Sequence, residues 1–594
     1  MKEIIDGNTA CSKAAYLFSE LCSIYPITPS SPMASNVDLL SSKDKKNLFN
    51  EKVNVIEMQS EAGAAGAMHG ALISGSLAST FTASQGLLLM IPNMYKIAGE
   101  CLPGVIHVAS RTVATHALSI FGDHSDIYAT RQTGFCMLAS SNVKDAYYLG
   151  SVAHLSAIKG SLPFLHFFDG FRTSHELNTV DLMEEKELLK LVNYQKINEF
   201  KEKALNYKSN IQRGMAENED IYFQSIEARN NLYNKMPDIV NEYMQKINKI
   251  ANTSYKPFEY YGVKDANSLI IAMGSVVDTI KLVIDKENKN GKKYGLVEVH
   301  LYRPFSQKYL LDVIPDTVKN IAVLDKTKEA GSIGEPLYLD VISALKDKNI
   351  KIIGGRYGIS SKNVVPGDIY SVYKNLENTC KNNFTIGITD DVTNLSLEKN
   401  DYNIPFNGKE IKIYGFGSDG MVSASKDIIK IIGNKTTSYA QGYFQYDSKK
   451  SGGVTISNLR ISNNPINNPY YVTNPDIVVV TKQEYFNKYD MLNNIKDNGI
   501  LLINSSNINQ LLENLKCIPS LKEKNISIIT IDAEKIALLN NIKGKINKII
   551  EVIILRLLKV DGAIDIVKQS IIEKFKTKGE DIVNNNIIAI NSVF

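Results

Sequence analysis

The sequence predicts an α/β protein of several domains, in which mostly parallel strands alternate with helices. Continuous apolar runs end in polar residues, as in residues 102–110 before Arg111 and residues 161–169 before Gly170. Such runs are typical of buried parallel strands, and helical patterns lie between them. The length of 594 residues also favours several domains, at about 100–200 residues each.

We predict three α/β domains, which span residues 1–257, 258–408 and 409–594. The first ends in a more charged, helical region at 183–250, which we expect to cover its outside, followed by an extended linker at 255–262. A polar, turn-rich connection at 382–408 precedes the third domain. Strands of the second domain are predicted at 268–275, 294–300, 320–325 and 351–358, and those of the third at 411–416, 476–480 and 500–504.

Composition excludes several classes of protein. Apolar residues make up 44% of the chain and charged residues 22%, and a net charge of +4 with dispersed charges predicts no nucleic-acid or membrane surface. The first seven residues lack an apolar signal core, so we expect a cytoplasmic protein. Residues 62–90 lack charged side chains but contain many small polar ones, which favours a buried helix and strand over a membrane span of about 20 mainly apolar residues.

The cysteine spacing predicts no redox centre within this chain. No two cysteines lie within ten residues of each other, so the runs typical of iron–sulfur clusters and structural zinc sites are absent. We expect mostly buried, inert thiols. Asp123, His124 and Asp126 lie close together in the sequence and form either a metal site or a hydrogen-bonded loop. We prefer the loop, and so predict no metal site. The cysteines are Cys11, Cys22, Cys101, Cys136, Cys380 and Cys517.

Three unusual stretches, residues 25–31, 58–67 and 84–90, predict a functional site in the first domain. In the first, Pro26 and Pro29 hold the Thr28 hydroxyl in a stiff turn. In the second, Glu61 is the only charged side chain at the start of a run of glycine and alanine. Glu61 is either a partner of a helix dipole or a carboxyl shielded from water and suited to proton transfer.

Polar residues at the ends of the predicted strands extend this site. Arg111 follows the predicted strand at 102–110, Asp169 ends the one at 161–169 and Arg172 comes just after it, while Thr28 lies in the proline-held turn. In open α/β sheets, ligands bind outside the carboxyl ends of the strands, so we expect these four residues at one edge.

The third domain opens with a glycine turn. Gly415, Gly417 and Gly420 form the spacing G-x-G-x-x-G between a strand and a helix, but the acidic residue that a dinucleotide site needs about 20 positions later is absent. The turn can still hold an anion at the start of a helix. Lys449 and Lys450, in a loop that ends at Gly453, are either solvated or a second phosphate contact.

Together these motifs resemble pyruvate:ferredoxin (flavodoxin) oxidoreductases, a thiamine-diphosphate-dependent family of 2-oxoacid oxidoreductases. The resemblance covers the whole chain, which corresponds to the N-terminal three domains of the family's proteins. These are a pyrimidine-binding domain, a transketolase C-terminal-like domain and a third, gamma-subunit-like α/β domain. It implies that Glu61 hydrogen-bonds the aminopyrimidine ring and that Thr28 and Arg111 bind the substrate. The most specific stretches are 25–31, 58–67, 82–99, 116–134, 166–176 and 446–459.

The resemblance also implies a reaction and partners. Pyruvate would be decarboxylated and its acetyl group passed to coenzyme A, with ferredoxin or flavodoxin as electron acceptor. Gly415, Gly417, Gly420, Lys449 and Lys450 would contact coenzyme A. The family's diphosphate- and magnesium-binding domain and its iron–sulfur domain have no counterpart here, so we expect them on a partner, in a homodimer or hetero-oligomer, and expect this chain to be inactive without them.

Two alternatives stay open. One is the same chemistry on another 2-oxoacid, such as 2-oxoglutarate or a branched-chain acid. The other is a truncated or stand-alone product that only binds a partner or coenzyme A.

Overall fold

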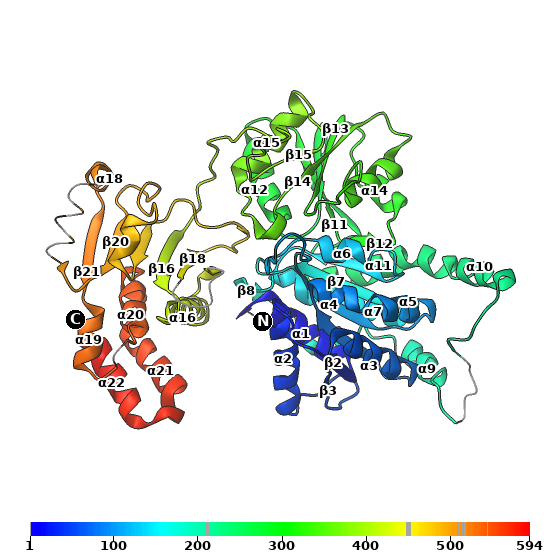
Figure 1. Ribbon diagram of the computed structural model, residues 1–594, viewed down its shortest axis with the longest axis horizontal. Coiled ribbons are helices and arrows are strands. Elements are labelled where there is room, and N and C mark those ends of the chain that lie inside the picture. Colours follow the sequence, from blue (N-terminus) through cyan, green and yellow to red (C-terminus); the bar gives the residue numbers. More distant parts are fainter. Residues whose placement is uncertain are drawn as a thin grey trace.

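The described residues form three β-sheets, each flanked by helices, which confirms the predicted α/β fold (Figure 1). The computed structural model describes residues 2–207, 213–446, 453–508, 511, 513, 515, 518–542 and 544–593. In these residues, no helix combines the length and apolar character that crossing a bilayer requires.

The first sheet has seven strands, all parallel except the edge strand β12. Its central strands β5 and β7 are buried along their whole length, which explains their continuous apolar sequence. Both begin just after a proline, at residues 103 and 163, and so start later than predicted. In order across the sheet the strands are β12 (Leu301–Arg303), β6 (Cys136–Ser140), β7 (Phe164–Asp169), β5 (Val105–Ser110), β4 (Ala78–Thr82), β2 (Leu21–Ile24) and β3 (Asn54–Glu57).

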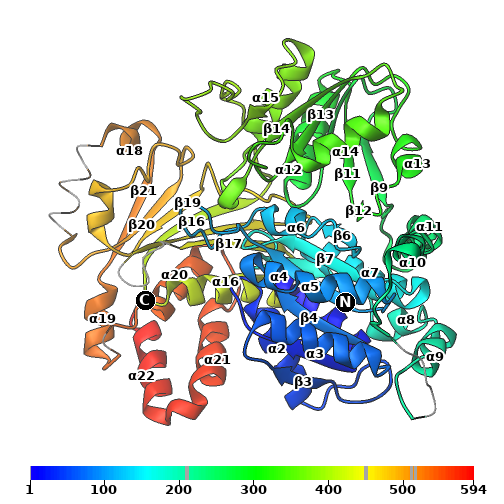
Figure 2. The same ribbon diagram turned by 45° about the vertical axis from the view of Figure 1, so that its right-hand side comes forward.

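Helices cover both faces of this sheet (Figure 2). One face packs on α1 and α7, and α11 packs outside α7. The other face packs on α3, α4 and α5, in an apolar cluster that continues into the second sheet. The helices are α1 (Gly7–Phe18), α2 (Ser31–Ser42), α3 (Glu61–Ile73), α4 (Ser84–Leu89), α5 (Ile91–Gly99), α6 (Ser125–Ala129), α7 (Val143–Gly160), α8 (Glu185–Leu189), α9 (Tyr194–Glu202), α10 (Glu219–Glu227) and α11 (Asn230–Ala251).

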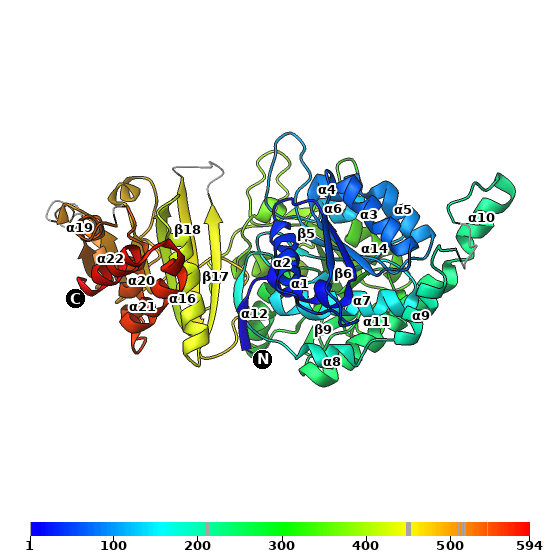
Figure 3. The same cartoon turned by 90° about the horizontal axis from the view of Figure 1, so that it is seen from below.

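The helical region predicted to cover the first domain does so only in part. α11 buries an apolar stripe that includes Met236, Val240 and Met244. α10 buries none of its residues and projects from the body (Figures 1 and 3).

The second sheet has six strands, and one of them corrects a prediction. Residues 255–262 were expected to be a linker, but Phe258–Gly262 form the strand β9, antiparallel to β11 at the sheet edge. Phe258 is buried there in the apolar cluster shared with the first sheet, which holds the segment in place. The strand order is β15 (Phe384–Thr385), β14 (Lys351–Arg356), β13 (Asn320–Asp325), β10 (Ser268–Ala272), β11 (Tyr294–Val299) and β9. Its helices are α12 (Val276–Lys289), α13 (Gln307–Leu311), α14 (Pro336–Leu345) and α15 (Pro366–Glu377).

The third sheet joins the two ends of the chain. Strands β1 and β8 come from the N-terminal part, and β8 pairs with β17 (Figure 3). The strand order is β1 (Lys2–Ile5), β8 (Leu177–Asp181), β17 (Tyr439–Tyr446), β18 (Val454–Ser462), β16 (Lys409–Phe416), β19 (Ile477–Val480), β20 (Ile500–Asn504) and β21 (Ser527–Ile531). Its helices are α16 (Met421–Lys435), α18 (Pro519–Glu523), α19 (Ala533–Leu539), α20 (Asn547–Leu557), α21 (Ala563–Phe575) and α22 (Glu580–Asn591).

A buried histidine links the first and second sheets. The His300 backbone accepts from Ala139 N–H, and its Nδ1 lies 3.1 Å from the Ala139 oxygen. Its Nε2 lies 3.6 Å from an oxygen of Glu259 and 3.6 Å from one of Glu298. Burial alone would lower the pKa of His300, but these carboxylates outweigh it and raise the pKa to about 9, from an ordinary 6.5.

We predict that His300→Gln destabilises the protein most at low pH. Because the folded state raises the pKa of His300, its contribution to stability is complete below 6.5 and is lost as the pH rises through about 9. The loss in melting temperature relative to wild type should therefore shrink between about pH 6 and about pH 10. The exposed His116 provides a control, and a loss for His300→Gln that is the same at both pH values would contradict the prediction.

Candidate active site

The loops that follow the strands of the first sheet meet at one edge, and Arg111 connects two of them. Arg111 directly follows β5 and is buried, and its Nη1 donates to the Thr28 backbone oxygen over 2.7 Å. The sequence predicts a role for the Thr28 hydroxyl, but the contact to Arg111 uses the backbone, and the Thr28 residue is exposed. Burial lowers the pKa of Arg111, and Asp126 acts in the opposite direction. The Arg111 Nε is buried without a hydrogen-bond partner in the described structure.

Glu61 stands at the first turn of α3, next to the same edge. Ser60 caps this helix, because its side chain accepts from Gly63 N–H over 3.0 Å. Glu61 is only 8% exposed, as expected for a carboxyl shielded by small residues. Within the described part of the chain, its carboxylate forms no ion pair or hydrogen bond, so it is available to a ligand.

Gly86 on α4 lies directly against Glu61. A Cβ added to Gly86 would lie 2.6 Å from Thr82 Oγ1 and 2.8 Å from both Cγ and Oε1 of Glu61. The Thr82 hydroxyl is buried and, in the described residues, has no hydrogen-bond partner. The glycine therefore leaves room at a carboxyl and a hydroxyl that have no hydrogen-bond partner among the described residues.

We predict that Gly86→Ala lowers the turnover of the complete enzyme by about 10–100-fold, because a displaced carboxyl loses its alignment. Steady-state assays would measure this, with circular dichroism as a check of folding. Gly66→Ala is the matched control, since Gly66 lies in α3 and a Cβ there would meet nothing within 4 Å. Equal activity of the two variants would contradict this role for Gly86.

Asp126 ties the Arg111 loop to α4. Its Oδ2 accepts from Ser84 N–H over 2.8 Å and from Arg111 N–H over 2.9 Å. Burial raises the pKa of Asp126 to about 8, although these backbone donors act in the opposite direction. The contacts run from Arg111 through Asp126 and Ser84 to the helix that carries Gly86, and so connect Arg111 to Glu61. The sequence alone did not reveal this role of Asp126.

Asp123, His124 and Asp126 lie in a hydrogen-bonded loop, in agreement with the preferred alternative. Asp123 accepts from the hydroxyls of Thr112 and Ser125, and His124 Nε2 lies 2.7 Å from Asp169 Oδ1. The three side chains therefore have separate partners.

Asp169 and Arg172 connect domains. Asp169 is fully buried and accepts from Lys326 Nζ over 2.8 Å and from Ser275 N–H over 3.1 Å, both in the second domain. The Arg172 guanidinium lies 4.0 Å from the ring centroid of Tyr471 in the third domain. Asp169 ends β7 and Arg172 lies just after it, at the predicted edge, and their partners hold the domains together.

The glycine turn of the third domain lies between β16 and α16, as predicted. Gly417 N–H donates to the Gly453 oxygen over 2.8 Å, and Gly420 caps α16 with a φ of 80°, which favours glycine. Lys449 and Lys450 lie outside the described residues. No hydrogen bond or ion pair of the described chain joins this turn to Glu61, Thr28 or Arg111.

A cavity of about 560 Å³ lies beside this turn. Ser418 and Gly420 line one side of it, and lysines from the C-terminal helices line the other. The lysines are Lys545, Lys548, Lys574 and Lys578.

Comparisons with known proteins identify the family. Three family models match in chain order: "Pyruvate flavodoxin/ferredoxin oxidoreductase, thiamine diP-bdg" at residues 13–245, "Pyruvate:ferredoxin oxidoreductase core domain II" at 266–369, and "Pyruvate ferredoxin/flavodoxin oxidoreductase" at 410–594.

Curated relatives agree with these matches. The chain is 48% identical to the pyruvate:ferredoxin oxidoreductase of Moorella thermoacetica, over 99% of this chain and 51% of that protein. It is 47% identical to the pyruvate-flavodoxin oxidoreductase of Enterobacter agglomerans, with the same coverage. It is 44% identical to the NADP⁺-dependent pyruvate dehydrogenase of Cryptosporidium parvum, over 99% of this chain and 31% of that protein. The chain spans about half the length of the first two relatives, and it belongs to the pyruvate:ferredoxin and pyruvate:flavodoxin oxidoreductase family.

Proposed function

We propose that this chain supplies the pyrimidine and substrate half of the active site of a thiamine-diphosphate-dependent pyruvate oxidoreductase. The observation that carries the proposal is Glu61, a buried carboxyl without a partner in the described chain, which faces Gly86 at the sheet edge that also holds Arg111. Family membership supports the reaction class: oxidative decarboxylation of pyruvate, with coenzyme A as acetyl acceptor and ferredoxin or flavodoxin as electron acceptor.

The residues at this edge fit the pyrimidine ring of the cofactor. A flat ring needs a close approach, which the missing side chain of Gly86 allows. A ring nitrogen needs a hydrogen-bond donor, which Glu61 supplies when its carboxyl is protonated. When bound, thiamine diphosphate supplies the carbon nucleophile and the electron sink that decarboxylation requires. Glu61 would hold the proton at its carboxyl oxygen and control the protonation of the ring.

Arg111 and Thr28 would bind pyruvate. A guanidinium suits a planar carboxylate because two N–H groups can donate side by side, and the exposed Thr28 hydroxyl can orient the keto oxygen. The bond from Arg111 to the Thr28 backbone holds the two groups together.

We predict that Arg111→Lys raises the KM for pyruvate by about 10-fold or more, since an ammonium cannot donate in the same planar, paired geometry. Turnover measured over a range of pyruvate concentrations tests this. Arg131→Lys is the control, because Arg131 donates to the Tyr128 backbone oxygen and pairs with Glu329 in the second domain. An unchanged KM for Arg111→Lys would remove Arg111 from the substrate site.

The third domain would bind coenzyme A. Gly415, Gly417 and Gly420 lie in or beside the turn from β16 to α16, and the first N–H groups of α16 can hold a phosphate. Of the cavity lysines, Lys545 and Lys578 are exposed and offer positive charge nearby. Lys449 and Lys450 are retained as further contacts of the proposal. The three domains would span residues 1–257, 258–408 and 409–594.

We assign the remaining functions to partner chains or domains. The site for the diphosphate and magnesium, and the iron–sulfur clusters, would lie in the part of the relatives that this chain does not match. This chain would then be inactive without them, in a dimer or hetero-oligomer.

Gentle purification from the native source tests the proposal. The preparation should contain thiamine diphosphate and iron–sulfur clusters, and should reduce a viologen dye with pyruvate and coenzyme A. Comparison with 2-oxoglutarate and branched-chain 2-oxoacids identifies the substrate, and we expect pyruvate to turn over fastest. A chain that purifies alone, without activity but with bound coenzyme A, would instead support a coenzyme A-binding protein.

A further inference from the structure

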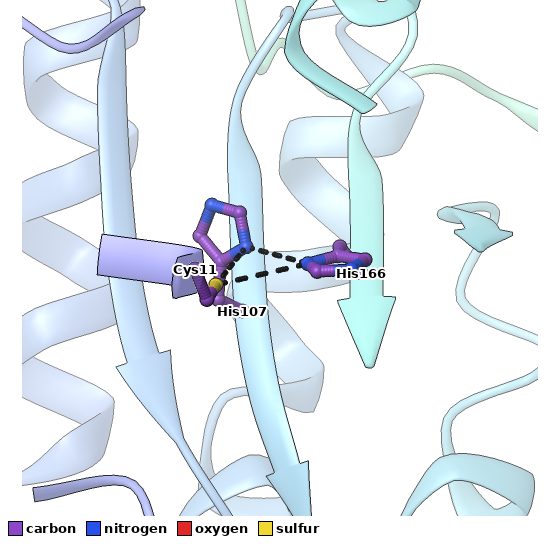
Figure 4. Close-up of side chains that lie close together, drawn as sticks. All are labelled: Cys11, His107 and His166. Atoms are coloured by element: carbon purple, nitrogen blue, oxygen red, sulfur yellow. Dashed lines mark hydrogen bonds between the residues drawn. The ribbon is translucent and has the colours of Figure 1, made fainter. Parts of the chain in front are cut away.

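A second cluster of reactive side chains lies inside the first domain, among residues that the proposed reaction does not use. Cys11 on α1, His107 on β5 and His166 on β7 are each 0% exposed. His107 and His166 are direct neighbours in the parallel pairing of β5 and β7, and Cys11 reaches them from the helix that covers this face (Figure 4). The three residues are far apart in the sequence, so no metal-binding motif indicated them.

Three potential ligand atoms converge in this cluster. The two Nδ1 atoms of His107 and His166 lie 3.0 Å apart. The Cys11 sulfur lies 3.1 Å from Nδ1 of His107 and 3.8 Å from Nδ1 of His166. Metal–nitrogen bonds of about 2.0 Å and metal–sulfur bonds of about 2.3 Å place donor atoms about 3.3–3.7 Å apart, so only a small expansion would admit an ion.

The outer nitrogens of both rings already have partners. His107 Nε2 lies 3.0 Å from Nε2 of His154, and His166 Nε2 lies 2.8 Å from the Ser140 hydroxyl. These contacts fix both rings with Nδ1 toward the sulfur. Metal-binding histidines are typically oriented in this way, by a hydrogen bond on the nitrogen opposite the metal.

We propose that Cys11, His107 and His166 bind one thiophilic, monovalent cation with the chemistry of Cu⁺. Thiolate sulfur and imidazole nitrogen are donors that Cu⁺ and Zn²⁺ both accept, so charge decides between the two ions. No carboxylate of the described residues forms a hydrogen bond or ion pair with the three side chains. A thiolate cancels the charge of Cu⁺, whereas Zn²⁺ would leave a net positive charge buried in the core, at a high cost.

The metal-free form is a neutral hydrogen-bonded network in which the potential donors outnumber the acceptor lone pairs. If His107 donates through Nε2 to His154, its Nδ1 has one lone pair, which faces both the Cys11 thiol and His166 Nδ1. Burial keeps the Cys11 thiol protonated, because it raises its pKa well above the ordinary value. On binding, the sulfur–hydrogen bond breaks, a sulfur–copper bond forms and the proton leaves to solvent. The His166 proton moves to Nε2 and is donated to Ser140.

Metal analysis of the full-length chain tests the proposal. Because the cluster is closed, the chain would be refolded anaerobically, under reducing conditions, with Cu⁺ or with Zn²⁺. We expect one equivalent of Cu⁺ to remain after removal of free metal, and X-ray absorption at the copper edge to show one sulfur and two nitrogen neighbours. A chain that retains no Cu⁺, or retains Zn²⁺ in preference to it, would overturn the assignment.

Two serine variants separate metal binding from hydrogen bonding. Cys11→Ser keeps a hydroxyl that can donate to His107, so a purely hydrogen-bonded cluster would tolerate it, but it should lose the Cu⁺ equivalent. Cys136→Ser is the matched control, since Cys136 is equally buried, in strand β6 of the sheet that carries both histidines. Retention of Cu⁺ by Cys11→Ser, with folding verified by circular dichroism, would contradict the proposal.

Discussion

Replacement of Glu61 by glutamine is expected to lower the turnover of the complete enzyme by about 100-fold or more, the usual range for loss of a group that transfers protons. The amide has nearly the same size, and Ser60 still caps α3 through Gly63, so the fold should persist. What is lost is a proton that can be held or released at the carboxyl oxygen. Pyruvate-dependent dye reduction measures the change.

Glu57→Gln provides the control for this experiment. Glu57 ends the neighbouring strand β3 and is exposed, so the same chemical change there should leave activity unaltered. If Glu61→Gln retained full activity, the proposed role of Glu61 would fail, whatever the overall reaction proved to be.

Replacement of Lys326 by methionine is expected to cost about 3–5 kcal/mol of folding stability, because it leaves the buried Asp169 carboxylate without its cation. Lys326 is 3% exposed and Asp169 is 0% exposed. Although burial alone would raise the pKa of Asp169, Lys326 and His124 hold it well below its ordinary value, so the carboxylate stays charged. Urea denaturation of the variant should show the loss.

Two further variants make this prediction specific. Lys351→Met changes an exposed lysine in β14 of the same sheet and should have little effect. Adding Asp169→Asn to Lys326→Met removes the unpaired charge and should recover part of the stability. A stability of Lys326→Met equal to that of Lys351→Met would show that the buried pair contributes nothing.

The sequence predicted the strands well because buried parallel strands carry a continuous apolar signal. The ends of β5 and β7 were predicted in this way and place Arg111, Asp169 and Arg172 at one edge. The strand β2, which precedes Thr28, was not among the predicted strands. Pairing between distant segments carries no such local signal. The addition of β1 and β8 to the third sheet, and of β12 to the first, was therefore not predictable.

Side-chain partners were harder to predict than positions. The pairing of Asp169 with Lys326 joins residues that are 157 positions apart, and neither neighbourhood indicates the other. Gly86 lay in a stretch that stood out in the sequence, but its contact with Glu61 depends on how α3 and α4 pack. The contact of Arg111 with the Thr28 backbone, in place of its hydroxyl, depends on the local path of the loop.

The central claim is that this chain holds one half of a thiamine diphosphate site. Its most direct test is viologen reduction by pyruvate and coenzyme A, measured against thiamine diphosphate concentration, for the isolated chain and for the complete enzyme. We predict saturable, cofactor-dependent reduction by the complete enzyme and none by the isolated chain. Equal activity of the isolated chain, or activity of the complete enzyme that does not depend on thiamine diphosphate, would contradict the account.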